Sequence, residues 1–297
     1  MSQITVENLC KSFKVTRRKG ELVGFIGPNG VGKSTTVKIM SGILVPDSGR
    51  CEVLGRTPWV HRVEHVRQIG VVFGQRTQLW WDVPVIDSFD LLRDIYRIPR
   101  TSYEQMKNEL VEVLSLQSLL AVPVRQLSLG QKMRCELAAS LLHQPPILFL
   151  DEPTIGLDAV SKIAVRGFIE KMNRDRKVTV ILTTHDMDDI EALCSRIMVI
   201  GRGTILFDGS IEHLRNTLAP ERILKVDFLE HARKLDYPFA TLASKNGDRA
   251  EFRFNPLVVS ATQMIAAVST DNHIKDFVVE DPPIEEIVAG MYKKFQI

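Results

Sequence analysis

The chain has 297 residues, 44% of them hydrophobic and 25% charged, a composition typical of soluble globular proteins. Its formal charge of +2 is too small to indicate a protein that holds nucleic acid through the phosphates, so no nucleic acid partner is expected. No apolar stretch approaches the roughly 18 to 20 residues that cross a bilayer, residues 1–11 do not resemble a secretory signal, and the cysteines are too far apart to favour a disulfide or metal framework. We therefore expect a cytoplasmic chain that is neither secreted nor membrane-spanning.

The first two-thirds of the chain alternate short β-branched runs with helical patterns. Strands are predicted at 21–26, 69–73, 147–151 and 178–184, and helices from Lys33 and Ala159. Near-continuous apolar strands that alternate with helices indicate a parallel sheet covered by helices. Between these strands the pattern becomes helical, over 88–98 and 102–116, which predicts a helical subdomain at about 76–140.

After Gly209 the pattern changes again, which predicts a second domain. A helix at 211–218 and a break at Pro220 precede the elements of this domain. Strands are predicted at 222–228, 250–255 and 274–280, a turn at 246–248, and helices at 260–268 and 284–292. We therefore expect one domain over 1–218 and a small α+β domain over 222–297.

The strongest local signal is a glycine-rich segment that follows the strand at 21–26 and opens a helix. It matches G-x-x-x-x-G-K-[ST] and consists of Gly27, Pro28, Asn29, Gly30, Val31, Gly32, Lys33, Ser34 and Thr35. The glycines let backbone N–H groups wrap an anion, and the helix N-terminus adds partial positive charge. Lys33 is placed to reach the β- and γ-phosphates of a nucleotide, and the Ser34 hydroxyl to coordinate Mg²⁺. We predict a phosphate-binding P-loop, because a simple turn does not require Lys and Ser at the mouth of a helix.

A pair of acids ends the buried strand at 147–151. Asp151 lies at the carboxyl end of this strand, where a carboxylate beside a P-loop can hold Mg²⁺ through water. Glu152 is placed to orient and polarise the water that attacks the γ-phosphate. Either acid alone could cap a helix, but their combination with a P-loop favours the catalytic interpretation.

The segment Leu127-Ser128-Leu129-Gly130-Gln131 precedes a long helical run, and by itself it predicts only a helix N-cap at Ser128. Over residues 1 to about 218, however, the chain resembles the nucleotide-binding subunits of ABC transporters. The features that carry this resemblance are, in chain order, the P-loop, Gln75, the Leu-Ser-x-Gly-Gln segment, Asp151-Glu152, Asp158 and His185.

The resemblance implies an α/β fold, namely a P-loop NTPase with an ABC-type helical insertion and an N-terminal antiparallel β subdomain. It implies ATP and Mg²⁺ as ligands and a second copy that faces the first head to tail. The signature motif of one copy (Ser128, Gly130, Gln131) would then close over the nucleotide held by the P-loop of the other.

The resemblance also implies roles for three further residues. Gln75 would touch Mg²⁺ or the attacking water, and His185 would hold the γ-phosphate and this water in place. Asp158 would cross the dimer interface, although by itself it is an ordinary helix N-cap.

The chain departs from the family pattern at two places. Leu129 stands where the commonest signature has Gly, a variant that resembles exporters of the ABC-2 type. Only about a dozen residues separate Phe13 from Gly27, where the family has a further strand. Phe13 can be interpreted as the aromatic that stacks on adenine or as a phenylalanine of this strand. With a shortened N-terminus, phosphate and Mg²⁺ contacts would supply most of the affinity.

The function implied by the resemblance is ATP hydrolysis that powers export of an unidentified substrate through separate permease subunits, at the inner face of the cell membrane. An exposed Trp80-Trp81 pair would suit a groove for a helix of such a partner, and core packing is the alternative. One alternative function is a nucleotide-binding module impaired in hydrolysis by the shortened N-terminus. A soluble ABC ATPase outside transport is another, but it should show a coiled-coil insertion or two cassettes, and neither pattern is found.

Overall fold

A computed structural model describes residues 4–7, 20–74, 76–218 and 221–295. The chain divides into two compact units, Met1–Gly209 and Ser210–Ile297, and each is described by itself. None of the helices in the described ranges is long and apolar enough to cross a bilayer.

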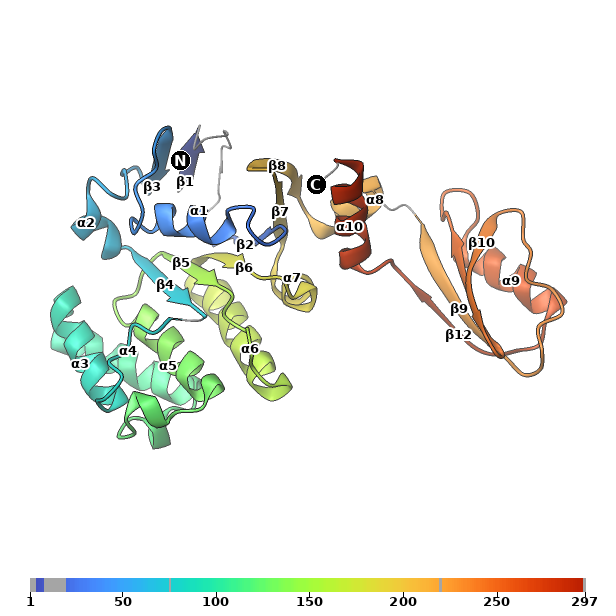
Figure 1. Ribbon diagram of the computed structural model, residues 1–297. Helices are drawn as coiled ribbons and strands as arrows, with labels where there is room; N and C mark the ends of the chain where they lie inside the picture. Colours follow the sequence, from blue (N-terminus) through green and yellow to red (C-terminus); the bar gives the residue numbers. More distant parts are fainter. Residues whose placement is uncertain (1–3, 8–19, 75, 219–220, 296–297) are drawn as a thin grey trace. The chain divides into compact units, whose positions relative to one another are not determined.

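A six-stranded sheet forms the centre of the first unit (Figure 1). Its strands, in spatial order, are β4 (Ile69–Phe73), β5 (Ile147–Asp151), β6 (Thr179–Thr183), β2 (Leu22–Ile26), β7 (Arg196–Gly201) and β8 (Thr204–Gly209). The first five strands are parallel, and β8 pairs antiparallel with β7. The predicted parallel sheet is therefore confirmed, with β7 and β8 as strands that the sequence analysis did not identify.

Helices cover both faces of this sheet, which explains why its central strands are apolar throughout. All residues of β2, β5 and β6 are buried. In Figure 1, α1 (Lys33–Met40) lies on one side of the sheet, and α5 (Leu129–Leu141) and α6 (Ala159–Arg176) lie on the other. The shorter helices α2 (Arg62–Val66) and α7 (Met187–Leu193) complete this part. Beyond α1, β1 (Ile4–Glu7) and β3 (Arg50–Val53) form an antiparallel pair.

Helices α3 (Val85–Tyr96), α4 (Arg100–Val113) and α5 form the helical part of the first unit, with short 3-10 turns η1 (Gln117–Leu119) and η2 (Val124–Gln126) between α4 and α5. The helices predicted at 88–98 and 102–116 correspond to α3 and α4. Tyr103 is fully buried, and its hydroxyl donates to Asp90 Oδ1 at 2.8 Å, which ties α4 to α3.

The second unit is a four-stranded antiparallel sheet with three helices. It contains α8 (Ile211–Leu218), β9 (Arg222–Phe228), β10 (Ala240–Asn246), β11 (Arg249–Phe254), α9 (Ala261–Asp271), β12 (Ile274–Glu280) and α10 (Ile284–Lys294), with strand order β10-β11-β9-β12. Phe252, Met264 and Val268 belong to its core. The sequence analysis placed 211–218 in the first domain, but α8 lies in the second unit because it packs against α10.

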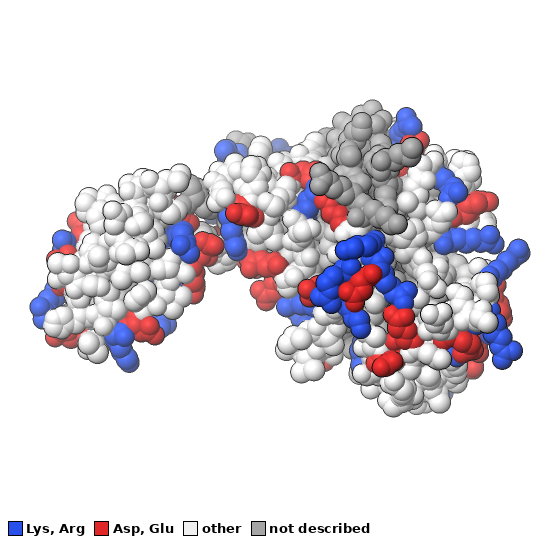
Figure 2. Space-filling view, turned by 180° about the vertical axis from the view of Figure 1, so that it is seen from behind, with Lys and Arg blue, Asp and Glu red and all other residues white. Residues whose placement is uncertain are grey.

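Basic and acidic side chains are mixed on the face of the molecule seen in Figure 2. The densest group of basic side chains on this face has acidic ones within it. This face therefore shows the same near balance of charge as the composition.

Candidate active site

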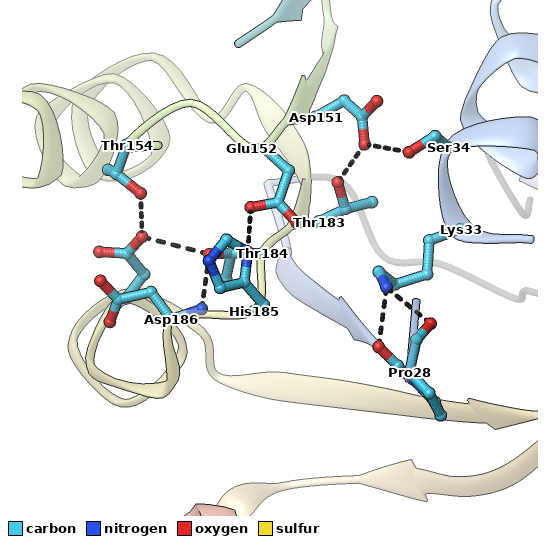
Figure 3. A network of polar contacts seen from close by, with 12 residues as sticks. Pro28, Lys33, Ser34, Asp151, Glu152, Thr154, Thr183, Thr184, His185 and Asp186 are labelled. Atoms are coloured by element: carbon cyan, nitrogen blue, oxygen red, sulfur yellow. Dashed lines mark hydrogen bonds and ion pairs between the residues drawn. The ribbon is translucent and has the colours of Figure 1, made fainter. Parts of the chain in front are cut away.

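The site is built at the carboxyl edge of the parallel sheet. The strands β5, β6 and β2 are neighbours in the sheet, so the loops that follow them emerge side by side. The loop after β2 is the P-loop, β5 ends at Asp151, and His185 follows β6. Segments that are far apart in the sequence therefore meet at one edge (Figure 3).

The P-loop has the backbone geometry of an open cradle. Gly30 and Gly32 adopt left-handed conformations with φ of 80° and 103°. A Cβ built at either glycine would meet no atom within 4 Å, so the space above the loop is open. Gly32 is also the N-cap of α1, and no side chain caps this helix. Its first N–H groups therefore point toward a space that fits an anion.

Lys33 is the buried cation of the site, with a side chain that lies under the P-loop. Its Nζ donates to the carbonyl oxygens of Gly27 at 2.7 Å and Pro28 at 3.0 Å (Figure 3). Burial lowers the pKa of Lys33, and the nearby Glu152 and Asp151 carboxylates oppose this effect. An ammonium group has three donors, so these two bonds leave one for a phosphate oxygen.

Ser34 and Asp151 present two hard oxygen donors to the same space. The Ser34 hydroxyl donates to Asp151 Oδ1 at 3.0 Å, and the Thr183 hydroxyl donates to the same oxygen. Hydroxyl and carboxylate oxygens are the ligands that Mg²⁺ prefers, and Mg²⁺ commonly takes few protein ligands beside the phosphates of a nucleotide. The residues present therefore fit the predicted Mg²⁺ site.

Glu152 is held in an unusual backbone conformation. Its φ is 57°, in the left-handed region, and its N–H donates to the carbonyl of Thr183 at 2.9 Å. A Cβ built on Gly74, just after β4, would lie 2.1 Å from the Glu152 carbonyl oxygen. Only glycine fits there, so Gly74 sets the position of Glu152. The sequence analysis did not single out Gly74, although a glycine directly after a buried strand was a usable signal.

The Glu152 carboxylate faces His185. His185 Nδ1 lies 2.8 Å from Glu152 Oε2, with exposed fractions of 62% and 20% for the two side chains (Figure 3). Burial raises the pKa of Glu152, while His185 and Lys33 counteract part of this rise. A carboxylate whose pKa is raised is a better proton acceptor than an ordinary surface glutamate.

A buried polar network fixes the loops that carry Glu152 and His185. Asp189 of α7 has an exposed fraction of 0% and accepts hydrogen bonds from the Thr154 hydroxyl and from Arg166 of α6, the latter at 2.5 Å. The Thr184 hydroxyl lies 3.4 Å from the same carboxylate. Because Thr154 follows Glu152 by two residues and Thr184 precedes His185, Asp189 connects both loops to α6. The sequence analysis did not identify this network.

The signature motif forms a second cluster at the starts of α5 and α6. Ser128 caps α5, with its Oγ accepting from Gln131 N at 3.3 Å and Gln131 Oε1 accepting from Ser128 N at 2.9 Å. A Cβ on the buried Gly130 would lie 2.4 Å from Ser161 Oγ, and Asp158 caps α6 by accepting from Ser161 N at 2.9 Å. Among the residues that the structure describes, no hydrogen bond joins this cluster to the P-loop.

Two predicted site residues, Gln75 and Phe13, lie outside the described residues. Leu129, the departure in the signature motif, has an exposed fraction of 43%, and its Cδ2 would lie 2.9 Å from a Cβ on Gly156. Trp80 and Trp81 have exposed fractions of 39% and 54%, which favours the surface interpretation of this pair over core packing.

Comparison with known proteins gives a family model, curated relatives and solved structures that match this chain. A family model described as ABC transporter matches residues 10–155. The probable multidrug ABC transporter ATP-binding protein YbhF of Escherichia coli K12 is 33% identical over 221 residues, which cover 72% of this chain and 37% of that protein. The ABC transporter ATP-binding protein NatA of Bacillus subtilis 168 is 29% identical over 204 residues, which cover 69% of this chain and 82% of that protein.

A solved structure, cbiO1 from Clostridium perfringens, described as part of the ABC transporter complex cbiONQ, superposes with a TM-score of 0.65 at 26% identity. The superposition covers 73% of this chain and 91% of that one, and it confirms the predicted fold class.

Proposed function

This chain contains the ATP-binding domain of the ABC transporter family, and from this premise we propose that it hydrolyses ATP to drive a transporter whose membrane-spanning subunits are separate chains. The observation that carries the proposal is the meeting of Lys33, Ser34, Asp151, Glu152 and His185 at one edge of the sheet. These side chains supply a phosphate cradle, a metal site and a proton acceptor in one place.

Each residue has a distinct task in this reaction. The P-loop N–H groups and Lys33 hold the β- and γ-phosphates of ATP. Ser34 and Asp151 would hold Mg²⁺, which neutralises phosphate charge when bound. Glu152 orients the attacking water and accepts its proton. His185, which contacts the Glu152 carboxylate, would hold the γ-phosphate and the attacking water in place. Gln75 would contact Mg²⁺ or the same water.

A second copy of the chain would complete the site. The signature cluster (Ser128, Gly130, Gln131 and Asp158) starts two helices whose ends carry exposed apolar side chains. Leu129, Val160 and Ile163 have exposed fractions of 43%, 78% and 69%. Apolar side chains gathered around an N-terminal helix end suit a surface that closes on a partner and its bound phosphate. In this arrangement each nucleotide lies between the P-loop of one copy and the signature cluster of the other.

A membrane partner would contact a groove beside the helical part. A pocket of about 370 Å³ is lined by residues that include Ile43, Phe73, Tyr96 and Glu136. Of these, Ile43 is 47% exposed. The floor carries Glu136, whose pKa is raised by burial and whose carboxylate accepts from Thr77. A groove lined by both apolar and polar side chains, with Arg62 and Arg76 beside Glu136, suits a helix that itself presents both apolar and polar side chains.

In this proposal the chain lies at the inner face of the cell membrane and is attached there through its permease partner. The name of YbhF, a probable multidrug transporter protein, supports export as the direction. The Leu129 variant of the signature motif supports an ABC-2 type exporter. The transported substrate is set by the membrane subunits. The chain spans 37% of the length of YbhF, so these statements concern the part that the two share.

The test is a comparison of Glu152→Gln and Lys33→Ala with the wild-type chain. Glu152→Gln should retain ATP binding but lower the rate of phosphate release on the order of a hundredfold or more, because the proton acceptor is lost. Lys33→Ala should weaken ATP binding itself by about tenfold or more. Glu112→Gln, at an exposed position of α4, is the matched control and should behave as wild type. Near-normal turnover of Glu152→Gln would refute the proposed role.

A further inference from the structure

Helix α10 of the second unit, which packs against α8, has one exposed face (Figure 1). The residues buried on its other side are Ile284, Ile287, Val288 and Met291. The exposed face, called the α10 face below, consists of Glu285, Glu286, Ala289, Gly290, Lys293 and Lys294. It therefore has acids at its start, bases at its end and two small residues between them.

The α10 face is complementary in charge to a second copy of itself. Glu285 lies as far before the middle of this face as Lys294 lies after it. The same is true of Glu286 and Lys293. Two α10 helices that run antiparallel about a twofold axis at this midpoint therefore place each glutamate of one copy opposite a lysine of the other.

The charges of the α10 face cannot pair within their own helix. Side chains pair along a helix when they are three or four residues apart, but Lys293 lies seven residues after Glu286, about 10 Å along the axis. Glu286 pairs instead with Arg253 of β11 at 2.5 Å. Glu285, Lys293 and Lys294 form no ion pair with any residue in the described part of the chain. Acids in the first turn and bases in the last turn also suit the helix dipole, which explains the order of the charges but not the small residues between them.

Gly290 is the residue that the helix itself does not explain, because glycine weakens a helix at an interior position. A Cβ built on it would meet no atom within 4 Å, so no contact inside the chain requires glycine there. The missing side chain borders a pocket of about 280 Å³ that is also lined by the buried Ile287 and Met291. Small residues on a helix surface let a second helix come close, and in the antiparallel pair Ala289 of one copy would lie opposite Gly290 of the other.

We propose that α10 of one copy packs antiparallel against α10 of a second copy of this chain. This contact goes beyond the proposed function, since it uses no residue of the P-loop or the signature cluster and needs no nucleotide. A pair of helices of 11 residues each buries less than the roughly 1,200 Å² of a stable interface, so we expect a dissociation constant on the order of 100 µM. The dilute chain is then a monomer without ATP, and the contact raises the local concentration of a partner for the ATP-dependent association.

Sedimentation equilibrium of the full-length chain without nucleotide, up to about 500 µM, tests the contact. Val160→Glu serves as the background, because it places a charge in the apolar surface at the start of α6 and so blocks the other association. Glu285→Lys and Lys294→Glu each bring like charges together in the pair, and each alone should weaken association by about tenfold. In an equimolar mixture of these two variants every such position again faces a charge of opposite sign, so association should return to the level of the background chain. Glu112→Lys, at an exposed position of α4, is the matched control and should associate normally.

A second variant separates loss of the contact from loss of the fold. Gly290→Leu places a large side chain where the helices approach, so association should weaken on the order of tenfold. Its melting temperature should not fall, because leucine favours a helix and its Cβ meets nothing in its own chain. Gly167→Leu, at an exposed glycine of α6 whose Cβ would also meet nothing within 4 Å, is the matched control and should leave association unchanged.

A background chain that stays monomeric over the whole concentration range would overturn the inference. So would association that is unchanged in the α10 variants, or a mixture of the two charge variants that associates no better than either alone. Each of these results concerns the chain without nucleotide, so the Mg-ATP-driven dimer of Glu152→Gln is tested separately and the proposed function can stand when the α10 contact fails.

Discussion

His185 Nδ1 lies 2.8 Å from Glu152 Oε2, and the two residues come from loops that follow neighbouring strands. The Glu152 carboxylate is largely buried, so its charge depends on the few cations close to it. Burial raises its pKa, and His185 is the largest of the effects that lower it. The pair therefore sets the pH range over which Glu152 is ionised and able to accept a proton.

The pH dependence of ATP hydrolysis should report this pair. Glu152 must be deprotonated to accept a proton, so the rate should fall as the pH is lowered through its raised pKa. His185→Ala removes the main effect that lowers this pKa, so the acid limb of the profile should move to higher pH. The maximal rate should also fall by about a hundredfold, because the carboxylate loses its partner.

Measurement of kcat from pH 5 to pH 9 checks this prediction. His213→Ala, in α8 of the second unit, is a suitable control. It should change neither the pH of the acid limb nor the maximal rate. An acid limb that stays at the wild-type pH in His185→Ala would show that His185 does not govern the ionisation of Glu152.

Gly74→Ala should lower activity through the position of Glu152. A Cβ at this position would come within 2.1 Å of the Glu152 carbonyl oxygen, so the loop after β5 must shift. ATP hydrolysis should fall about tenfold or more while ATP binding is largely retained, because the P-loop lies elsewhere. The free energy of unfolding should also fall by about 1 to 3 kcal/mol.

Gly167→Ala is the matched control for this substitution, since its Cβ would meet nothing within 4 Å on helix α6. It should stabilise the chain by about 0.5 to 1 kcal/mol, as expected for glycine in a helix interior. Wild-type turnover in Gly74→Ala would mean that the loop tolerates the shift and that Gly74 has no positioning role.

The difference between local motifs and long-range contacts determines how much of the site could be predicted from the sequence. The P-loop is a contiguous segment whose glycines and Lys33 serve one purpose, so its residues could be identified together. Asp151 and Glu152 end a fully apolar strand, which is also a local pattern. By contrast, Gly74 meets Glu152 across two neighbouring strands, and Asp189 meets Thr154 and Arg166 from different elements. Sequence spacing carries no information on such contacts.

Some strands were not predicted from the sequence, and the physical reason is related. β8 is the edge strand of its sheet and is only half-buried, so it lacks the continuous apolar run that marks β5 and β6. β10 is the edge strand of the second sheet, and most of its residues are exposed. A signal for the β7–β8 hairpin was nevertheless present at Arg202-Gly203, where both residues adopt positive φ.

The ion pair between Asp189 and Arg166 should contribute strongly to stability because one partner is fully buried. Asp189→Asn should lower the free energy of unfolding by about 3 kcal/mol, since the guanidinium loses its charged partner at 2.5 Å. Arg166→Met in the Asp189→Asn background should lower the free energy of unfolding by less than it does in the wild type, because Arg166 has already lost the charge of Asp189 and keeps only Asp186 at 3.6 Å.

Denaturant unfolding of the single and double variants measures this coupling. Glu170→Gln provides the comparison, because Glu170 pairs with Arg174 on the exposed face of α6 at 3.8 Å. The Glu170–Arg174 pair should contribute less than about 0.5 kcal/mol to the free energy of unfolding. Equal effects of Asp189→Asn and Glu170→Gln would argue against a special role for the buried network.

Association of two copies should require both bound ATP and the apolar surface at the start of α6. In Glu152→Gln, hydrolysis is blocked and ATP persists, so Mg-ATP should convert the chain from monomer to dimer in size-exclusion chromatography with light scattering. Val160 is 78% exposed beside the N-cap Asp158, and Val160→Glu in the same background should prevent the shift to a dimer by placing a charge in the closed surface.

Val258→Glu, at a residue 71% exposed in the second unit, is the matched control and should dimerise normally. A monomer at saturating Mg-ATP in Glu152→Gln would mean that the signature cluster does not close over a nucleotide. Equal loss of the dimer in both valine variants would mean that the two copies do not meet at the start of α6.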